Sequence, residues 1–163
     1  MENEKSITVA FTGHRTYQGE AEVELKQQLE ALYERGFRRF LTGMAWGFDL
    51  AAGVAVVELK KRYADVELVA VEPYLNFRMR FKGEDLALYD RVRDAADEVV
   101  QVCQSGSMQA YFRRNDYLTD NASIIVAWWN WLPKSGTEYT VKRARKRGLE
   151  VINLFPTIMP ELF

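Results

Sequence analysis

Short runs of apolar and β-branched residues alternate along the chain with longer segments in which apolar residues recur every three or four positions. The short runs have the length of buried strands, and the longer segments have the period of helices with one apolar face. The pattern predicts strands over Ile7–Thr12, Arg38–Thr42, Glu67–Val71, Glu98–Val102, Ser123–Trp128 and Val151–Phe155. It predicts helices over Glu20–Arg35, Phe48–Tyr63, Gly83–Ala96, Ser107–Asp120 and Thr137–Arg147. Such alternation is typical of an α/β protein with a parallel sheet.

The same alternation predicts how the sheet is assembled. Right-handed crossover connections place the first strand centrally and put helices on both faces, which makes a three-layer sandwich. We expect a mainly parallel sheet with a strand order near 3-2-1-4-5-6. The 163 residues fit a single domain over residues 1–163, with its core over about residues 6–155, because domains typically have about 100 to 200 residues.

Glycines and polar residues gather where three of the predicted strands end. In chain order these residues are Gly13, His14 and Arg15, then Gly43, Gly47 and Asp49, then Ser135, Gly136 and Thr137. The carboxyl ends of parallel strands share one edge of a sheet, and ligands bind there near the point where strand order reverses. Glycine lets backbone N–H groups approach a phosphate, and the following helix N-terminus adds partial positive charge. The three loops together predict one phosphate-binding site.

Each of these signals also has a purely structural explanation. A glycine can serve only a tight turn, and Asp49 can cap its helix instead of accepting hydrogen bonds from ribose hydroxyls. His14 and Arg15 are either surface residues of an ordinary turn or a titratable donor and a fixed cation for an anion. Arg114 and Asn115 lie in a polar run of a predicted helix, where they are either solvated or part of the same site.

The charge balance and the rare residues narrow the choice of ligand. There are 22 Lys and Arg residues against 23 Asp and Glu, a formal net charge of -1, so no overall basic field attracts nucleic acid or an anionic membrane. Any anionic ligand must be held locally. Cys103 is the only cysteine and His14 the only histidine, which excludes an intramolecular disulfide and a zinc site built on thiols or several histidines. A magnesium ion bound by carboxylates stays open, but no residues are assigned to a metal.

The sequence shows no pattern typical of a secretory signal peptide or a membrane-spanning helix. The first residues, MENEKSITVAF, lack a basic segment followed by a long apolar one, which a secretory signal peptide would have. No apolar run approaches the roughly 20 residues that a membrane-spanning helix needs. We therefore expect a cytoplasmic protein with no membrane partner.

Three sequence blocks resemble a known superfamily. Residues 42–52, TGMAWGFDLAA, resemble the SGxAxGID-type loop of the DNA-processing proteins Smf and DprA. Arg114-Asn115 and, after a predicted strand, residues 134–137, KSGT, resemble the RN and SGS/T blocks of the same superfamily, called SLOG after Smf/DprA and LOG. Residues 12–15, TGHR, and the short chain are similar to the YpsA-like single-domain branch. The resemblance covers about residues 6–155 and implies a Rossmann-like sheet whose loops hold a nucleotide or nucleotide derivative.

The resemblance also bears on catalysis. LOG enzymes, which release a base from a nucleoside monophosphate, carry a PGGxGTxxE block in which the glutamate is catalytic. Here Gly136-Thr137 matches that block, but Thr140 occupies the glutamate position, which leaves Glu72 and Glu138 as weak candidates for a catalytic carboxylate. We therefore expect a binding protein with a regulatory or sensory role, without appreciable base release.

The expected ligand is nucleotide-like, such as AMP, ADP-ribose or an NAD-like molecule, and no further cofactor is required. Two alternatives stay open. One is a LOG-like hydrolase of nucleotide N-glycosidic or phosphoester bonds, and the other is a DprA-like protein that binds single-stranded DNA. The sequence also leaves a homo-oligomer open.

Overall fold

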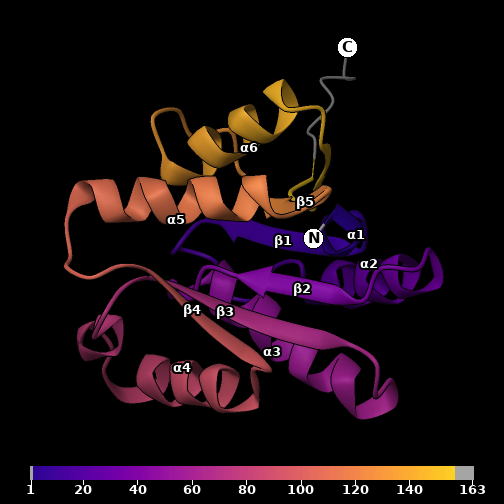
Figure 1. Ribbon diagram of the computed structural model, residues 1–163, viewed down its shortest axis with the longest axis horizontal. Helices are drawn as coiled ribbons and strands as arrows, with labels where there is room; N and C mark the ends of the chain where they lie inside the picture. Colours follow the sequence, from indigo (N-terminus) through magenta and orange to yellow (C-terminus); the bar gives the residue numbers. More distant parts are fainter. Residues whose placement is uncertain (1, 157–163) are drawn as a thin grey trace.

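In the computed structural model, which describes residues 2–156, a parallel sheet forms the middle layer of a three-layer sandwich (Figure 1). Within those residues the sheet has six strands in the order β4-β3-β2-β1-β5-β6. The strands are β1 (Thr8–Gly13), β2 (Arg39–Thr42), β3 (Glu67–Tyr74), β4 (Glu98–Cys103), β5 (Ile124–Trp128) and β6 (Glu150–Asn153). The register joins Val9 to both Phe40 and Ile124, so β1 is central. The α/β three-layer fold predicted from the sequence is confirmed.

Helices cover both faces of the sheet. On one face lie α2 (Glu22–Glu34), α3 (Phe48–Arg62), η1 (Phe77–Arg80) and α4 (Gly83–Ala95). On the other lie α5 (Met108–Asp120) and α6 (Gly136–Lys146), which Figure 1 shows above the sheet. A short helix, α1 (Glu2–Ser6), precedes β1 and was not predicted by the hydrophobic pattern. None of the helices among residues 2–156 is long and apolar enough to cross a bilayer.

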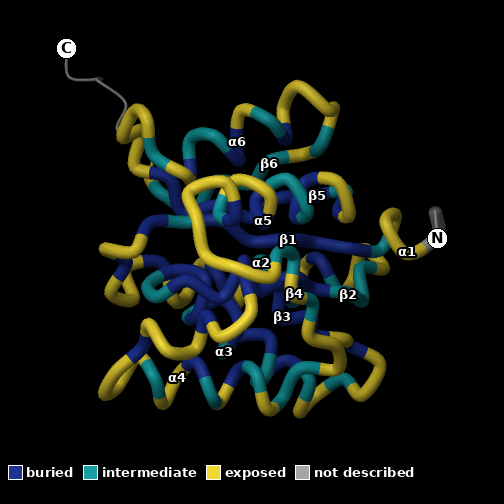
Figure 2. Tube along the Cα trace, turned by 60° about the vertical axis from the view of Figure 1, so that its left-hand side comes forward, coloured by how far each residue is buried: buried dark blue, intermediate teal, exposed yellow. Residues whose placement is uncertain are grey.

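Two apolar cores fill the spaces between the layers. Successive side chains of a strand point to opposite faces, so Leu68 and Ala70 of β3 pack toward α3 while Val69 and Val71 pack toward α5. Both faces of the central strands are therefore buried, and Figure 2 shows the strands in dark blue between partly exposed helices. Two-sided burial explains why the strands read as continuous apolar runs rather than as alternating ones.

The position of β4 differs from the prediction. The expected order puts the fourth strand between β1 and β5, whereas β4 pairs with β3 and forms the edge of the sheet. The reason is that α4 packs beside α3 on the same face, which carries the chain outward beyond β3. Glu98 and Val99 of β4 are exposed, as an edge position permits. The long helix α5 then crosses the other face and returns the chain to β5 beside β1.

Candidate functional site

The reversal of strand order between β1 and β5 opens a crevice at the carboxyl edge of the sheet. Its cavity has a volume of about 400 Å³. Nine of the residues singled out in the sequence line it, namely Gly13, His14, Arg15, Asp49, Arg114, Asn115, Ser135, Gly136 and Thr137. Gly43 and Gly47 do not line the cavity but support residues that do. The loops that the sequence placed at one edge therefore do meet there.

Gly47 joins the loop after β2 to the loop after β1. Its φ is +85°, and a Cβ atom there would lie 2.6 Å from both the His14 carbonyl oxygen and the Arg15 Cα. Only glycine permits that approach together with that backbone conformation. The Phe48 N–H then donates to the His14 carbonyl at 3.2 Å, which fixes α3 against the first loop.

Asp49 lies in the first turn of α3 and is 5% exposed. Its Oδ2 accepts a hydrogen bond from the Ala45 N–H at 3.3 Å, so the carboxylate does hold the loop. Its buried Oδ1 has no hydrogen-bond partner among the described residues. Burial raises the pKa of Asp49 to about 6, although the positive charge of Arg114 opposes that shift. One oxygen of this carboxylate thus fixes the loop before α3 rather than capping the helix, and the other is a buried acceptor without a partner in a residue that lines the crevice.

Arg114 holds the Gly43 loop from inside. It is 5% exposed, its Nη1 donates to the Gly43 carbonyl, and its Nε donates to the Asn115 Oδ1 at 2.8 Å. A Cβ on Gly43 would meet both Arg114 and Asp49 at 2.9 Å, so both charged side chains pack against this glycine. Burial lowers the pKa of the Arg114 guanidinium, and Asp49 counteracts that effect. This placement makes Arg114 mainly a support for the loop.

Arg15 is the exposed cation of the crevice. Its guanidinium carbon lies 4.2 Å from the centroid of the Trp46 ring and 5.7 Å from that of Tyr111. No carboxylate pairs with it within residues 2–156. Two aromatic rings thus fix the position of a positive charge without neutralising it. The sequence singled out neither aromatic residue as part of the site, although Trp46 belongs to the glycine loop.

His14 connects the first loop to the segment after β5. Its Nε2 accepts a hydrogen bond from the Asn130 N–H at 3.1 Å, and its ring meets Trp128 edge-on at 5.9 Å. Burial lowers the pKa of His14 while the Asn130 hydrogen bond opposes the shift. The imidazole is therefore neutral at pH 7, and it shapes the loop rather than supplying a charge.

The N-terminus of α6 completes the crevice. The Ser135 Oγ accepts from the Glu138 N–H at 3.0 Å, and the Glu138 Oε1 accepts from the Lys134 N–H at 2.9 Å. This reciprocal cap leaves the amides of Gly136 and Thr137 without intrahelical acceptors, at the positive end of the helix dipole. Both residues line the cavity, so a bound anion can satisfy these amides.

Backbone strain is concentrated in the loops around the crevice. Met44, Trp131 and Lys134 have φ values of 66°, 70° and 59°, a region that costs a non-glycine residue about 1 to 3 kcal/mol. Met44 lies in the loop after β2, and the other two lie between β5 and α6. The surrounding contacts therefore impose these loop shapes against local preference.

The carboxylates proposed for hydrolysis lie elsewhere or have other partners. Glu72 is 2% exposed, faces α4, and accepts hydrogen bonds from Tyr89, Arg93 and Gln101. It does not line the crevice. Glu138 is occupied by the cap of α6. Thr140, at the position of the LOG glutamate, is buried and its hydroxyl donates to the Gly136 carbonyl at 2.9 Å.

No cluster of three or more His, Cys, Asp or Glu side chains suited to a metal ion occurs in residues 2–156. The crevice is lined by backbone amides, one exposed guanidinium, one carboxylate with an oxygen that has no partner, and the ring of Tyr111. Such a set can bind a phosphorylated molecule that also carries hydroxyl donors.

Comparisons with known proteins identify the family of the chain. The YpsA family model, described as the YspA SLOG family, matches residues 10–154. The SPbeta prophage-derived protein YoqJ of Bacillus subtilis is 29% identical over an alignment of 159 residues that covers 86% of this chain and 92% of YoqJ. The superfamily resemblance drawn from the sequence blocks is thereby confirmed.

Two solved structures share the fold. DNA processing protein A (DprA) of Streptococcus pneumoniae superposes with a TM-score of 0.70 at 18% identity, over 96% of this chain and 53% of the DprA chain. DprA of Helicobacter pylori, whose structure concerns a single-stranded DNA binding mode, gives a TM-score of 0.63 at 14% identity, over 90% of this chain and 64% of that one. This chain therefore spans only about half to two-thirds of the DprA chains.

Proposed function

Because the chain belongs to the YspA SLOG family, we propose that it binds a nucleotide or nucleotide derivative in the crevice between β1 and β5. The observation that carries the proposal is the meeting of complementary unsatisfied groups in one cavity. The amides at the start of α6 and the guanidinium of Arg15 attract an anion, while the free Oδ1 of Asp49 accepts hydrogen bonds. A phosphorylated ribose offers both kinds of partner in one molecule.

Each group has a defined role in this proposal. The phosphate binds to the N–H groups of Gly136 and Thr137, where the helix dipole favours negative charge. Arg15 neutralises the phosphate from the opposite side of the cavity. A ribose hydroxyl donates to Asp49, which removes the penalty of a buried, unsatisfied acceptor. The ring of Tyr111, which also lines the cavity, offers the base a face for stacking.

We favour binding over hydrolysis because the one crevice carboxylate with a free oxygen, Asp49, is assigned to a ribose hydroxyl in this proposal, and the other two candidates have partners of their own. Cleaving an N-glycosidic bond needs a positioned acid or nucleophile at the anomeric carbon. Glu72 and Glu138 are held by other partners, and Asp49 is committed to Ala45 through one oxygen. A regulatory or sensory role, in which occupancy of the crevice is the signal, fits this chemistry.

The proposal predicts that Arg15→Ala weakens nucleotide binding by about 10- to 100-fold, since a lost charged contact costs about 1.5 to 3 kcal/mol. Isothermal calorimetry with AMP, ADP, ADP-ribose and NAD measures the change. Arg35→Ala is the matched control, because Arg35 pairs with Glu150 near the start of β6 and does not line the crevice. Equal affinity of wild type and Arg15→Ala for every nucleotide would remove Arg15 from the site. Absence of binding by the wild type would reject nucleotide binding itself.

A further inference from the structure

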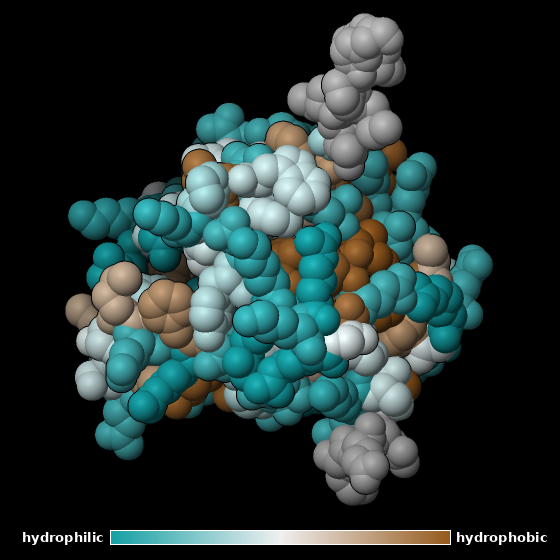
Figure 3. Space-filling model, turned by 90° about the horizontal axis from the view of Figure 1, so that it is seen from above, coloured by the Kyte–Doolittle hydropathy of each residue, from teal (hydrophilic) through white to brown (hydrophobic). Residues whose placement is uncertain are grey.

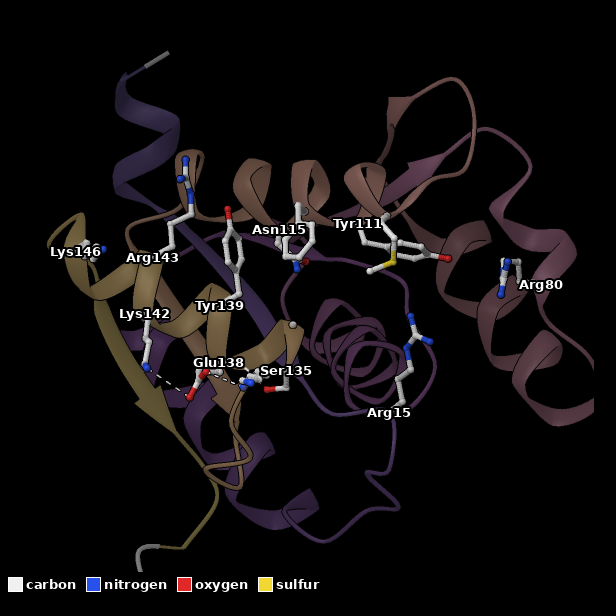
Figure 4. Close-up of a pocket in the computed structure, with 14 residues that line it drawn as sticks. Arg15, Arg80, Tyr111, Asn115, Ser135, Glu138, Tyr139, Lys142, Arg143 and Lys146 are labelled. Atoms are coloured by element: carbon white, nitrogen blue, oxygen red, sulfur yellow. Dashed lines mark hydrogen bonds and ion pairs between the residues drawn. The ribbon is translucent and has the colours of Figure 1, made fainter.

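A second cavity of about 770 Å³ continues the crevice along the groove between α5 and α6 (Figure 4). The two cavities share Arg15, Tyr111, Asn115, Ser135 and Gly136. We infer that this groove takes a second phosphate and a second base, so that the preferred ligand is a linear dinucleotide whose phosphates are separated by a nucleoside. This inference rests on the proposed nucleotide site and extends it.

The first reason is the charge of the groove. Its lining cations are Arg15, Arg80, Lys134, Lys142, Arg143 and Lys146. Arg143 pairs with Asp116 at 3.2 Å and Asp120 at 3.0 Å, and Lys142 lies 3.5 Å from Glu138, the only lining carboxylate in the described chain. The other four have no carboxylate partner within residues 2–156. Seen from the α6 side, hydrophilic side chains cover most of this face (Figure 3). One phosphate cannot balance this much positive charge.

The second reason is the apolar surface between the cations. Phe112 is 41% exposed and Met108 is 75% exposed, and both line the groove. The Phe112 ring meets the Tyr139 ring edge-on, with centroids 4.9 Å apart. Exposed aromatic rings beside cations are the elements with which proteins bind unpaired bases. The groove therefore offers a place for a base between two phosphate positions.

The third reason is length. Helix α6 rises about 1.5 Å per residue, so Lys142 lies about 9 Å and Lys146 about 15 Å along the helix axis from Gly136. Figure 4 shows Lys142 and Lys146 on successive turns of the same helix, away from Arg15. A phosphate bound at the N-terminus of α6 is therefore too far from Lys146 to contact that side chain as well. The phosphates of a diphosphate lie closer together than phosphates separated by a nucleoside, so the nucleoside brings the second phosphate further along the groove toward Lys142.

The test compares AMP, ADP-ribose and the 5′-phosphorylated dinucleotide pApA by calorimetry on wild type and on Lys142→Ala/Lys146→Ala. We expect the wild type to bind pApA at least about tenfold more tightly than AMP, because of the added charged contacts. The double variant should lose most of that advantage while its affinity for AMP stays within about threefold. Folding is not at risk, since Lys142 is largely exposed and loses only its ion pair with Glu138, and surface pairs of this kind contribute about 0 to 1 kcal/mol. Lys26→Ala/Lys61→Ala, on α2 and α3, is the matched control of equal charge change.

The outcomes separate the two claims. Failure of AMP, ADP-ribose and pApA alike to bind the wild type would reject the proposed function. Binding of AMP with no gain for pApA, or an equal loss for AMP and pApA in the double variant, would overturn the second phosphate position alone. If the affinity for ADP-ribose fell in the double variant as much as the affinity for pApA, the second phosphate position would also be overturned. A 5′-phosphorylated single-stranded decamer with the same lysine dependence would identify an oligonucleotide end as the source of the dinucleotide, and a decamer that fails to bind would identify a free dinucleotide.

Discussion

Gly47→Ala is expected to lower the free energy of unfolding by about 4 kcal/mol, combining backbone strain with a steric clash. The native φ of +85° is unfavourable for alanine, and the added Cβ would lie 2.6 Å from the backbone of residues 14 and 15. Neither backbone segment is the end of a flexible side chain, so the two loops must separate. Urea denaturation followed by circular dichroism measures the loss.

Gly36→Ala provides the control for this prediction. Gly36 also has a positive φ, +100°, but nothing lies within 4 Å of its Cβ position. Its substitution should therefore cost only the conformational part, about 1 to 2 kcal/mol. Equal losses for the two variants would show that the close approach at Gly47 contributes nothing to stability.

Asp49 is expected to make the protein less stable as the pH rises from about 4 to about 6. Burial raises its pKa from 3.8 to about 6, so over this interval the folded state holds a proton that the unfolded state has released. The proton contributes its full stabilisation at pH values below the pKa of Asp49 in the unfolded state. This stabilisation is lost as the pH rises through the pKa of Asp49 in the folded state. The difference between the two pKa values corresponds to about 3 kcal/mol.

The variant Asp49→Asn should remove this dependence. We expect the difference in unfolding free energy between wild type and Asp49→Asn to change by about 3 kcal/mol between pH 4 and pH 7. Denaturation curves at several pH values measure it, with the exposed Glu34→Gln as a control for general charge effects. Parallel pH profiles of wild type and Asp49→Asn would mean that the Asp49 carboxylate is not held in a desolvated position.

The meeting of three loops was predictable because it follows from topology. Once strands and helices alternate, the carboxyl ends of β1, β2 and β5 must lie at one edge, whatever the details of packing. Gly13, Arg15 and Asp49 could therefore be assigned to one place from their positions after strands. The sequence left Asp49 as a helix cap or as an acceptor for ribose hydroxyls. In the structure its Oδ2 holds the Ala45 N–H of the preceding loop and its Oδ1 has no partner among the described residues, so the ribose contact stays a prediction.

Contacts between distant elements were not predictable in the same way. The position of β4 depends on α4 packing beside α3. An apolar stripe along a helix shows that the helix is buried on one side, but not which element it packs against. Arg114 appears in the sequence as one of several charged residues, yet the approach of Gly43 buries it. Likewise, Trp46 and Tyr111 are 65 positions apart, and only the fold brings both rings to Arg15.

The most direct measurement of the central claim is an AMP titration of isotope-labelled protein followed by nuclear magnetic resonance of its amide groups. Nucleotide binding in the crevice predicts that the largest shifts fall on Gly13, Gly136 and Thr137 and on the indole of Trp46, because all lie in or beside the cavity. Amides around the separate cavity between α2, α3 and α4, such as Gly19, should not move. Saturating shifts centred on Gly19, or no shifts at millimolar AMP, would contradict the claim.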